Sequence, residues 1–168
     1  MLRLARRYLP DLFPTELKHL HDIAGKLAKD IMLNLANACK VSGEGTEFYP
    51  WMPGFLKENP FIQYVYVTNA QARLLGMAIS NEAYRENYNR LPLGYDFSNR
   101  EWFINPMRDG GLYLSGIYQS QMTGKLVLTV STAIPGDNGG IAGILGADIE
   151  LEELLRQADG NVSHDEDA

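Results

Sequence analysis

The sequence predicts an α+β domain in which one central antiparallel sheet of about five strands is covered by helices on one side. Three observations indicate this class. A long stretch with helical periodicity comes first, five runs rich in β-branched and aromatic residues follow, and turn signals separate those runs. The expected order is a long helix, two strands, an excursion that contains a helix, three strands and a short closing helix.

The long helix is expected to run from Pro14 to about Ser42. Proline suits the first helical position, and Glu16 suits the positive end of the helix dipole. Apolar residues then recur at three- and four-residue steps from Leu17 to Ala38. Such a helix reaches roughly 40 Å at about 1.5 Å per residue, which is longer than one small core covers. Part of it is therefore expected to stand free or to meet a partner.

The middle of the chain predicts an irregular connection followed by a hairpin. Segment 43–60 is rich in glycine, proline and aromatic residues, and one helical turn is expected near residues 54–58. Two apolar runs, 62–67 and 72–79, are joined by the turn signal at 68–71 and predict two antiparallel strands. Segment 80–97 is polar and predicts a long loop with one short helix.

The second half predicts one more helix, three strands and a closing helix. Asp96 or Ser98 is expected to cap a helix that runs through Trp102 to about Met107 and ends at the glycines that follow Asp109. Strands are expected at 112–118, 126–134 and 141–149, with a hairpin turn at 135–140 between the last two. The closing helix is expected at 150–157.

The length of 168 residues fits one domain. We expect a lead-in at 1–13, a single domain at 14–158 and a disordered acidic tail at 159–168. Hydrophobic residues make up 45% of the chain and charged residues 21%, the balance of a soluble globular protein. The net charge of −6 argues against a nucleic-acid partner, because a duplex binder needs a basic face.

The residues that carry most catalytic and metal chemistry are sparse and scattered. Cys39 is the single cysteine, so no intrachain disulfide and no cysteine-based zinc site can form. His19 and His21 lie on different faces of the expected helix, and neither a metal nor another cofactor is expected. The sequence shows no nucleophile–base set, so we do not expect an enzyme. It also lacks a run of about 18 apolar residues. A complete chain would thus be cytoplasmic, whereas a segment excised from a receptor would be extracytoplasmic.

Three segments together resemble a known family. They are 95–103, which contains Arg100 and Trp102; 118–129, with Thr123-Gly124-Lys125 inside it; and 143–149, which contains Asp148. Their order is similar to that in the Cache superfamily of PAS-like ligand sensors, also called PDC sensor domains, and closest to the single-module type. The resemblance covers roughly residues 14–156 and implies a sensory, chemoreceptor-like binding domain.

The resemblance implies a pocket between the sheet and the excursion that carries Arg100 and Trp102. A guanidinium is a planar two-pronged donor that matches a carboxylate, and an indole supplies an apolar wall. Because residues two apart do not share a helix face, the two side chains converge only where a helix begins. Tyr95 can add a hydroxyl. The implied ligand-binding residues are Tyr95, Arg100, Trp102, Phe103, Tyr118, Ser120 and Asp148.

The expected ligand is a small carboxylate without an amine, with an amino acid second. In family members that bind free amino acids, a tyrosine and two acidic residues hold the ammonium group. Tyr118 and Asp148 match two of those positions, but the other acidic position holds Ser120, and Phe103 replaces the usual tyrosine. Both departures weaken an ammonium site more than a carboxylate site.

Several alternatives stay open at this stage. Arg100 could lie on a solvated helix face, Trp102 could be a core residue, and Asp148 could cap the closing helix. A different class of function is a ligand-free dimerisation scaffold, which predicts a filled or collapsed pocket. The expected partners are a small carboxylate, a second copy of the chain through the N-terminal helix, and a signalling protein that the sequence does not identify.

Overall fold

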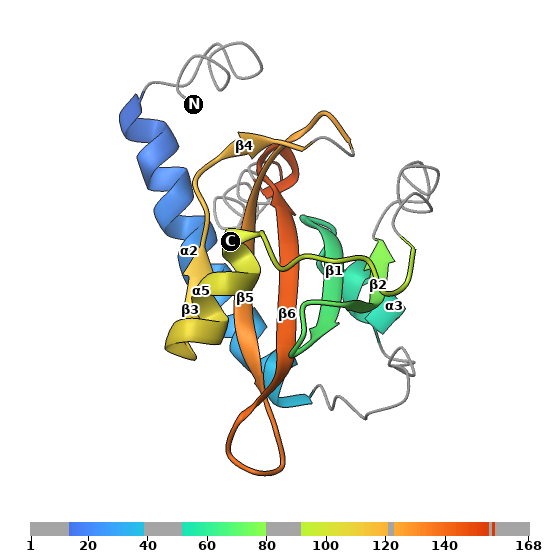
Figure 1. Ribbon diagram of the computed structural model, residues 1–168. Helices are drawn as coiled ribbons and strands as arrows, with labels where there is room; N and C mark the ends of the chain where they lie inside the picture. Colours follow the sequence, from blue (N-terminus) through green and yellow to red (C-terminus); the bar gives the residue numbers. More distant parts are fainter. Residues whose placement is uncertain (1–13, 39–51, 80–91, 121–122, 155, 157–168) are drawn as a thin grey trace.

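The computed structural model describes residues 14–38, 52–79, 92–120, 123–154 and 156. Its sheet has six strands in the order β2-β1-β6-β5-β3, with β4 paired to β5, and every pairing is antiparallel (Figure 1). The elements are α2 (Pro14–Ala38), α3 (Met52–Glu58), β1 (Ile62–Asn69), β2 (Leu74–Ile79), α5 (Glu101–Asp109), β3 (Leu112–Leu114), β4 (Tyr118–Gln119), β5 (Leu126–Pro135) and β6 (Ile141–Glu150).

The predicted α+β class with a central antiparallel sheet is confirmed. The strand expected at 112–118 is two short strands, β3 and β4, which both pair with β5. The expectations for the lead-in at 1–13, for the loop at 80–91 and for the tail at 159–168 fall outside the described residues. Across the described parts of the chain, no helix is long and apolar enough to cross a bilayer.

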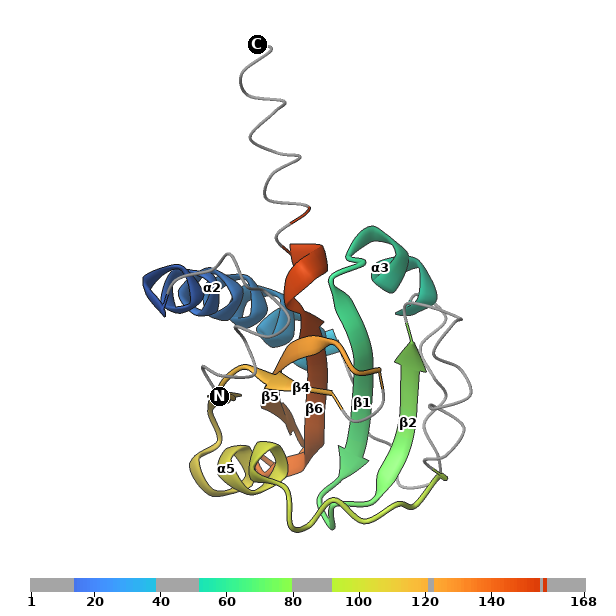
Figure 2. The ribbon, with the colours of Figure 1, turned by 90° about the horizontal axis from the view of Figure 1, so that it is seen from above.

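Helices lie on both faces of the sheet, so the expectation of helices on one side is wrong. Figure 2 shows α2 and α3 on one face and α5 on the other. Ala24 of α2 and Leu56 of α3 belong to the cluster that also contains Leu145, whereas Phe103 of α5 packs with Ile144. Neighbouring residues of β6 are thus buried on opposite faces. Such continuous burial is typical of a sheet that is covered twice.

Helix α2 packs on β5 and β6 through one side. Leu20, Ala24 and Met32 are buried, whereas 40% of Leu27 is exposed. A Cβ atom on Gly25 would lie 3.0 Å from Leu114 Cδ2, so the absence of a side chain there lets the helix approach β3 closely. The outward position of Leu27 agrees with a helix that one small core does not cover, and the expected homodimer stays a prediction.

Helix α5 begins later than the capping signals predict. The N-cap residue is Arg100, in an extended conformation (φ −93°, ψ 133°) and without a side-chain capping hydrogen bond. The expected caps are therefore wrong: Asp96 Oδ1 instead accepts the Ser98 backbone N–H at 2.8 Å and so closes the turn before the helix. At the other end, Gly110 has the left-handed conformation (φ 68°) expected of a helix-ending glycine.

The segment that leads into α5 is bonded to the start of β2. Leu74 donates its backbone N–H to Tyr95 O, and Phe97 donates to Ala72 O, each at 2.9 Å. Asp96 also forms an ion pair with Arg73 at 3.7 Å. These bonds hold Tyr95 and Phe97 beside the sheet, next to the beginning of α5.

Asp148 lies within β6, opposite Tyr64 of β1 and Thr129 of β5. The strand continues to Glu150, and helical residues begin only at Leu151. The alternative in which Asp148 caps the closing helix is therefore wrong, and its side chain is available on the face of the sheet that α5 covers.

Candidate ligand-binding site

A cavity of about 620 Å³ lies over the face of the sheet that carries α5. Its walls come from the segment before α5, from the first turn of α5, from β3 and β4 with their connection, and from β1, β5 and β6. The lining residues are Tyr66, Tyr95, Phe97, Asn99, Arg100, Glu101, Trp102, Tyr113, Ser115, Gly116, Tyr118, Gln119, Ser120, Thr129 and Asp148.

All the residues predicted for the site line this cavity except Phe103. Phe103 is buried in a separate apolar cluster with Ala72 and Ile144. Sequence reasoning missed Tyr66 and Thr129, both on segments that were interpreted only as strands. One signal was present: Thr129 is the first polar residue within the apolar run that begins β5.

The start of α5 explains how Arg100 and Trp102 converge. Arg100 precedes the helix with extended backbone angles, and Trp102 lies in the first helical turn. The two residues therefore escape the rule that positions two apart on a regular helix face different directions. The condition that the sequence set for their convergence is met, because both line the same cavity.

Four aromatic rings form one wall of the cavity. Trp102 stacks on Tyr66 with 5.5 Å between ring centroids, and Phe97 lies 4.9 Å from both Trp102 and Tyr95. Gly146 lies beneath this wall, where a Cβ atom would be 2.9 Å from Tyr66 Cδ2 and 3.5 Å from Trp102 Cε3. The bare backbone at Gly146 therefore lets the rings lie directly on the sheet.

A hydrogen-bonded carboxyl group lies in the polar part of the cavity. Asp148 is 5% exposed, and its Oδ1 accepts the Thr129 hydroxyl at 2.7 Å and the Tyr118 hydroxyl at 3.4 Å. Thr129 Oγ1 and the Tyr118 hydroxyl are 2.5 Å apart, and Tyr66 also hydrogen-bonds Asp148. Hydroxyl groups from β1, β4 and β5 thus converge on one side chain of β6.

Burial changes the proton affinity of these groups. It raises the pKa of the Asp148 carboxyl above its usual value, although hydrogen bonds from Tyr66, Thr129 and Tyr118 act in the opposite direction. The pKa of Tyr118 is also raised, first by burial and then by Asp148, while Arg100 opposes the shift. Tyr118 therefore keeps its hydroxyl proton at neutral pH and can act as a donor.

Asp148 is expected to disfavour folding increasingly as pH rises. The pKa of Asp148 is higher in the folded protein than in the unfolded chain, so the folded protein binds the proton more tightly. This stabilisation is complete below the unfolded-state pKa of about 3.9 and is lost as pH rises through the folded-state pKa. Asp148→Asn should therefore gain stability over the wild type between pH 4 and pH 7. The gain should be about 1.4 kcal/mol for each tenfold difference in the acid dissociation constant of Asp148 between the folded and the unfolded chain.

Denaturant unfolding at several pH values measures this difference. Asp137→Asn, in the exposed turn after β5, makes the same change of charge away from the cavity and is the control variant. If the stability gained by Asp148→Asn shrinks as pH rises, the raised pKa of Asp148 is wrong.

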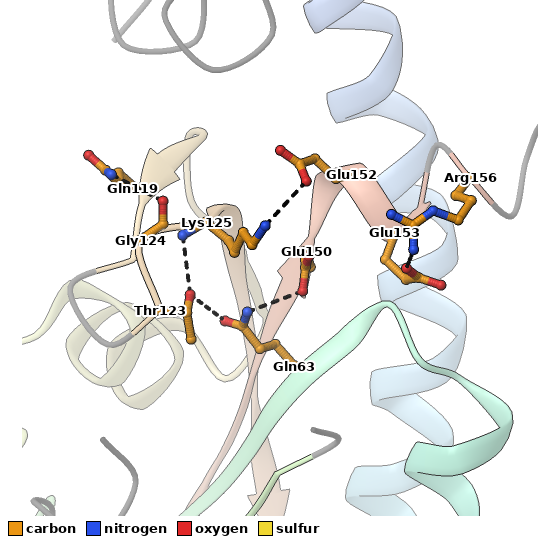
Figure 3. Close-up of polar contacts among 9 residues, drawn as sticks. All are labelled: Gln63, Gln119, Thr123, Gly124, Lys125, Glu150, Glu152, Glu153 and Arg156. Atoms are coloured by element: carbon orange, nitrogen blue, oxygen red, sulfur yellow. Dashed lines mark hydrogen bonds and ion pairs between the residues drawn. The ribbon is translucent and has the colours of Figure 1, made fainter. Parts of the chain in front are cut away.

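Thr123, just before β5, is tied to the sheet by polar contacts (Figure 3). The Thr123 hydroxyl donates to Gln63 Oε1 at 3.3 Å, and Gln63 Nε2 donates to Glu150 Oε2 at 3.2 Å. Gln63 is the extra residue at the irregularity of β1 between Ile62 and Tyr64. These contacts hold Thr123 against the end of the sheet.

No group of three or more histidine, cysteine, aspartate or glutamate side chains is arranged to hold a metal within the described residues. What the cavity offers a ligand is therefore an aromatic wall, hydroxyl groups and charged side chains of both signs. This is the composition of a binding pocket that orients a small polar molecule against an apolar surface.

Two curated proteins are similar in sequence to this chain. A citrate (Re)-synthase from Syntrophus aciditrophicus (strain SB) is 34% identical over 153 residues, which is 90% of this chain and 24% of that protein. The methyl-accepting chemotaxis protein McpB of Bacillus subtilis (strain 168) is 30% identical over 98 residues, 58% of this chain and 14% of that protein. The chain therefore spans about a quarter or less of the length of these curated relatives.

A solved structure shares the architecture. The ligand-binding domain of the amino acid chemoreceptor PctC of Pseudomonas aeruginosa PAO1, in complex with GABA, superimposes with a TM-score of 0.56 at 18% identity. The match covers 82% of this chain and 58% of that one. A family model, "Methyl-accepting chemotaxis protein-like, first PDC sensor domain", matches residues 31–156. On this match the chain belongs to the PDC sensor domains of the methyl-accepting chemotaxis protein type.

Proposed function

We propose that this domain senses a small molecule bearing a carboxylate, which binds in the cavity with its carboxylate on Arg100. The observation that carries the proposal is the placement of Arg100 beside Trp102 and Tyr118 in one cavity. A guanidinium pairs with a carboxylate through two parallel hydrogen bonds, and a charge-assisted bond is stronger than a neutral one. The remaining aromatic wall suits a short aliphatic body.

The second candidate is a ligand that also carries an amine, such as an amino acid. Asp148 lines the same cavity as Arg100 and is surrounded by hydroxyl groups, which favours this candidate. Against it, the position two residues after Tyr118 holds Ser120 rather than an acid. The three hydroxyl groups that bond Asp148 also satisfy it without a ligand, so we rank the carboxylate without an amine first.

The alternative of a ligand-free scaffold predicts a filled or collapsed pocket. A cavity of about 620 Å³ falls within the range of about 300–1,000 Å³ found for small-molecule sites, and this favours a ligand. We also propose that the domain is a binding module rather than an enzyme. The stretch shared with the synthase relative covers 90% of this chain and therefore includes most of the sensor segment 31–156. The similarity to that relative thus lies largely in the sensor segment, which supports a binding role for the shared part.

Ligand occupancy is proposed to reach a signalling partner through the elements around the cavity. The family description, a first PDC sensor domain, favours the prediction of an extracytoplasmic receptor segment over that of a cytoplasmic protein. The identity of the partner and dimerisation through α2 stay predictions.

A thermal-shift screen tests the proposed function. A ligand at a hundredfold excess over its Kd should stabilise the folded state by about 2.7 kcal/mol. For a domain of this size that corresponds to a rise in Tm of roughly 5–10 °C. The panel contains short-chain organic acids and free amino acids, with the amides of the same acids as matched neutral controls. The proposal fails if no acid raises the Tm, or if the amides raise it equally.

A further inference from the structure

The charged side chains that line the cavity are unequal in number. Within the described lining, the acidic residues are Glu101 and Asp148, and the basic residue is Arg100. Arg100 can neutralise one carboxylate of a ligand, after which the wall offers a further anion no cationic partner. The described wall therefore favours ligands with one negative charge over ligands with several.

Glu101 is held at the wall of the cavity by Tyr113. The Tyr113 hydroxyl donates to Glu101 Oε2 at 3.1 Å, across from α5 to β3. Burial first, and then Glu101, raise the pKa of Tyr113, so its hydroxyl stays protonated and remains a donor. Tyr113 is paired with Ser131 of β5, whose hydroxyl donates to Trp102 O at 2.5 Å. The carboxylate therefore has a defined place between two anchored elements.

Arg100 and Glu101 are neighbours in the chain but have different surroundings. Arg100 precedes the helix, and its charge acts on Tyr118 of β4. Glu101 is the first helical residue and contacts Tyr113 of β3. A ligand with its carboxylate on Arg100 would extend into a cavity whose other charged lining residues are Glu101 and Asp148. Salt screens the repulsion between like charges, so a second ligand carboxylate is repelled most at low ionic strength.

We infer that Glu101, positioned by Tyr113, is a specificity-determining residue that rejects ligands with a second carboxylate. The inference rests on the proposed function and goes beyond it by setting the class of ligand: a monocarboxylate whose distal end is neutral or cationic. Repulsion of the wrong ligand is an effective route to specificity. Citrate and other polycarboxylates are excluded by the same charge pattern, despite the name of the synthase relative.

A matched series of four-carbon acids tests this inference by calorimetry at low ionic strength. Butyrate, succinate and 4-aminobutyrate have the same chain length and differ at the distal end, which is a methyl, a carboxylate or an ammonium group. For the wild type we expect butyrate and 4-aminobutyrate each to bind at least about tenfold more tightly than succinate, and citrate to bind no better than succinate.

Two variants assign the discrimination to the proposed pair. Glu101→Gln keeps the shape of the side chain and removes its charge. It should reduce the ratio of the butyrate affinity to the succinate affinity by about fivefold or more. Tyr113→Phe should narrow it less, because the carboxylate remains but loses its anchor. Asp137→Asn removes a negative charge from an exposed turn outside the cavity lining and should leave the gap unchanged.

The outcomes separate the specificity of Glu101 from the proposed function. If succinate binds as tightly as butyrate, or if Glu101→Gln leaves the gap as wide as in the wild type, the specificity role is overturned and the carboxylate-binding function stands. If none of the acids binds to the wild type or to Glu101→Gln, the failure overturns the binding function and the specificity role together. A gap that closes equally in Asp137→Asn would show a long-range charge effect and overturn the role of Glu101.

Discussion

Arg100→Ala is expected to weaken binding of the small carboxylate ligand by about 30-fold or more, which corresponds to roughly 2 kcal/mol. The loss follows because the described lining of the cavity offers no other cation to a carboxylate. Arg100→Lys should recover little of it, since an ammonium group cannot supply the planar two-pronged geometry. Titration calorimetry with the acid that gives the largest shift in the thermal screen measures both changes.

Arg108→Ala is the matched control for this prediction. Arg108 is an exposed arginine near the C-terminal end of the same helix, where it bonds Asp109 and Asn105 and does not line the cavity. Its removal deletes the same charge from α5 and should change the affinity less than about twofold. If Arg100→Ala binds the acid with wild-type affinity, the Arg100 guanidinium is not part of the ligand site.

Local signals were sufficient to predict most of the described elements. The β1–β2 turn is one such case, because the Asn69 side chain accepts the backbone N–H groups of Gln71 and Arg73 at 3.0 Å. Such contacts between a side chain and the neighbouring backbone depend on a few adjacent residues. The end of α5 at Gly110 was predicted for the same reason, and so were β1, β5 and β6 to within two residues, whereas the single strand expected at 112–118 is β3 and β4.

The arrangement of layers was not predictable from the same signals. A long strand buried on both faces and a core strand covered on one face differ only in whether alternate positions are polar. Tyr64 and Tyr66, on the α5 face of β1, are aromatic and are as consistent with a core as Val65 and Val67 on the other face. The start of α5 was predicted too early because Asp96, expected as a cap, instead accepts the Ser98 backbone N–H and pairs with Arg73.

The site divides in a similar way. Arg100, Trp102 and Tyr95 were assigned through the resemblance, because they lie close together in one motif. Thr129 and Tyr66 enter the cavity through strand register, since Thr129 lies opposite Asp148 and Tyr66 lies opposite Gly146. Register is a long-range property, and a single sequence does not determine which strand lies next to which.

Register also makes Gly143 the position at which a single methyl group should have the largest effect on stability. A Cβ atom at Gly143 would lie 1.9 Å from the backbone oxygen of Thr68 and 3.0 Å from its carbonyl carbon. The atoms in the way belong to β1 itself, so no side-chain rotation can relieve the clash. Gly143→Ala is expected to cost more than about 3 kcal/mol, at or above the upper end of the usual range for overpacking.

Gly146→Ala provides the matched comparison on the same strand. The nearest atoms to its added Cβ are ring atoms of Tyr66 and Trp102, which can move, so the expected cost is smaller, about 1–2 kcal/mol. The displaced rings belong to the cavity wall, however, and ligand affinity should fall more in Gly146→Ala than the change in stability explains. Thermal unfolding and calorimetry of both variants separate the two effects. A Tm for Gly143→Ala within about 2 °C of the wild type would mean that β1 and β6 do not approach as closely as described. The positions of Tyr66 and Asp148 in the cavity, which depend on this pairing, would then be wrong as well.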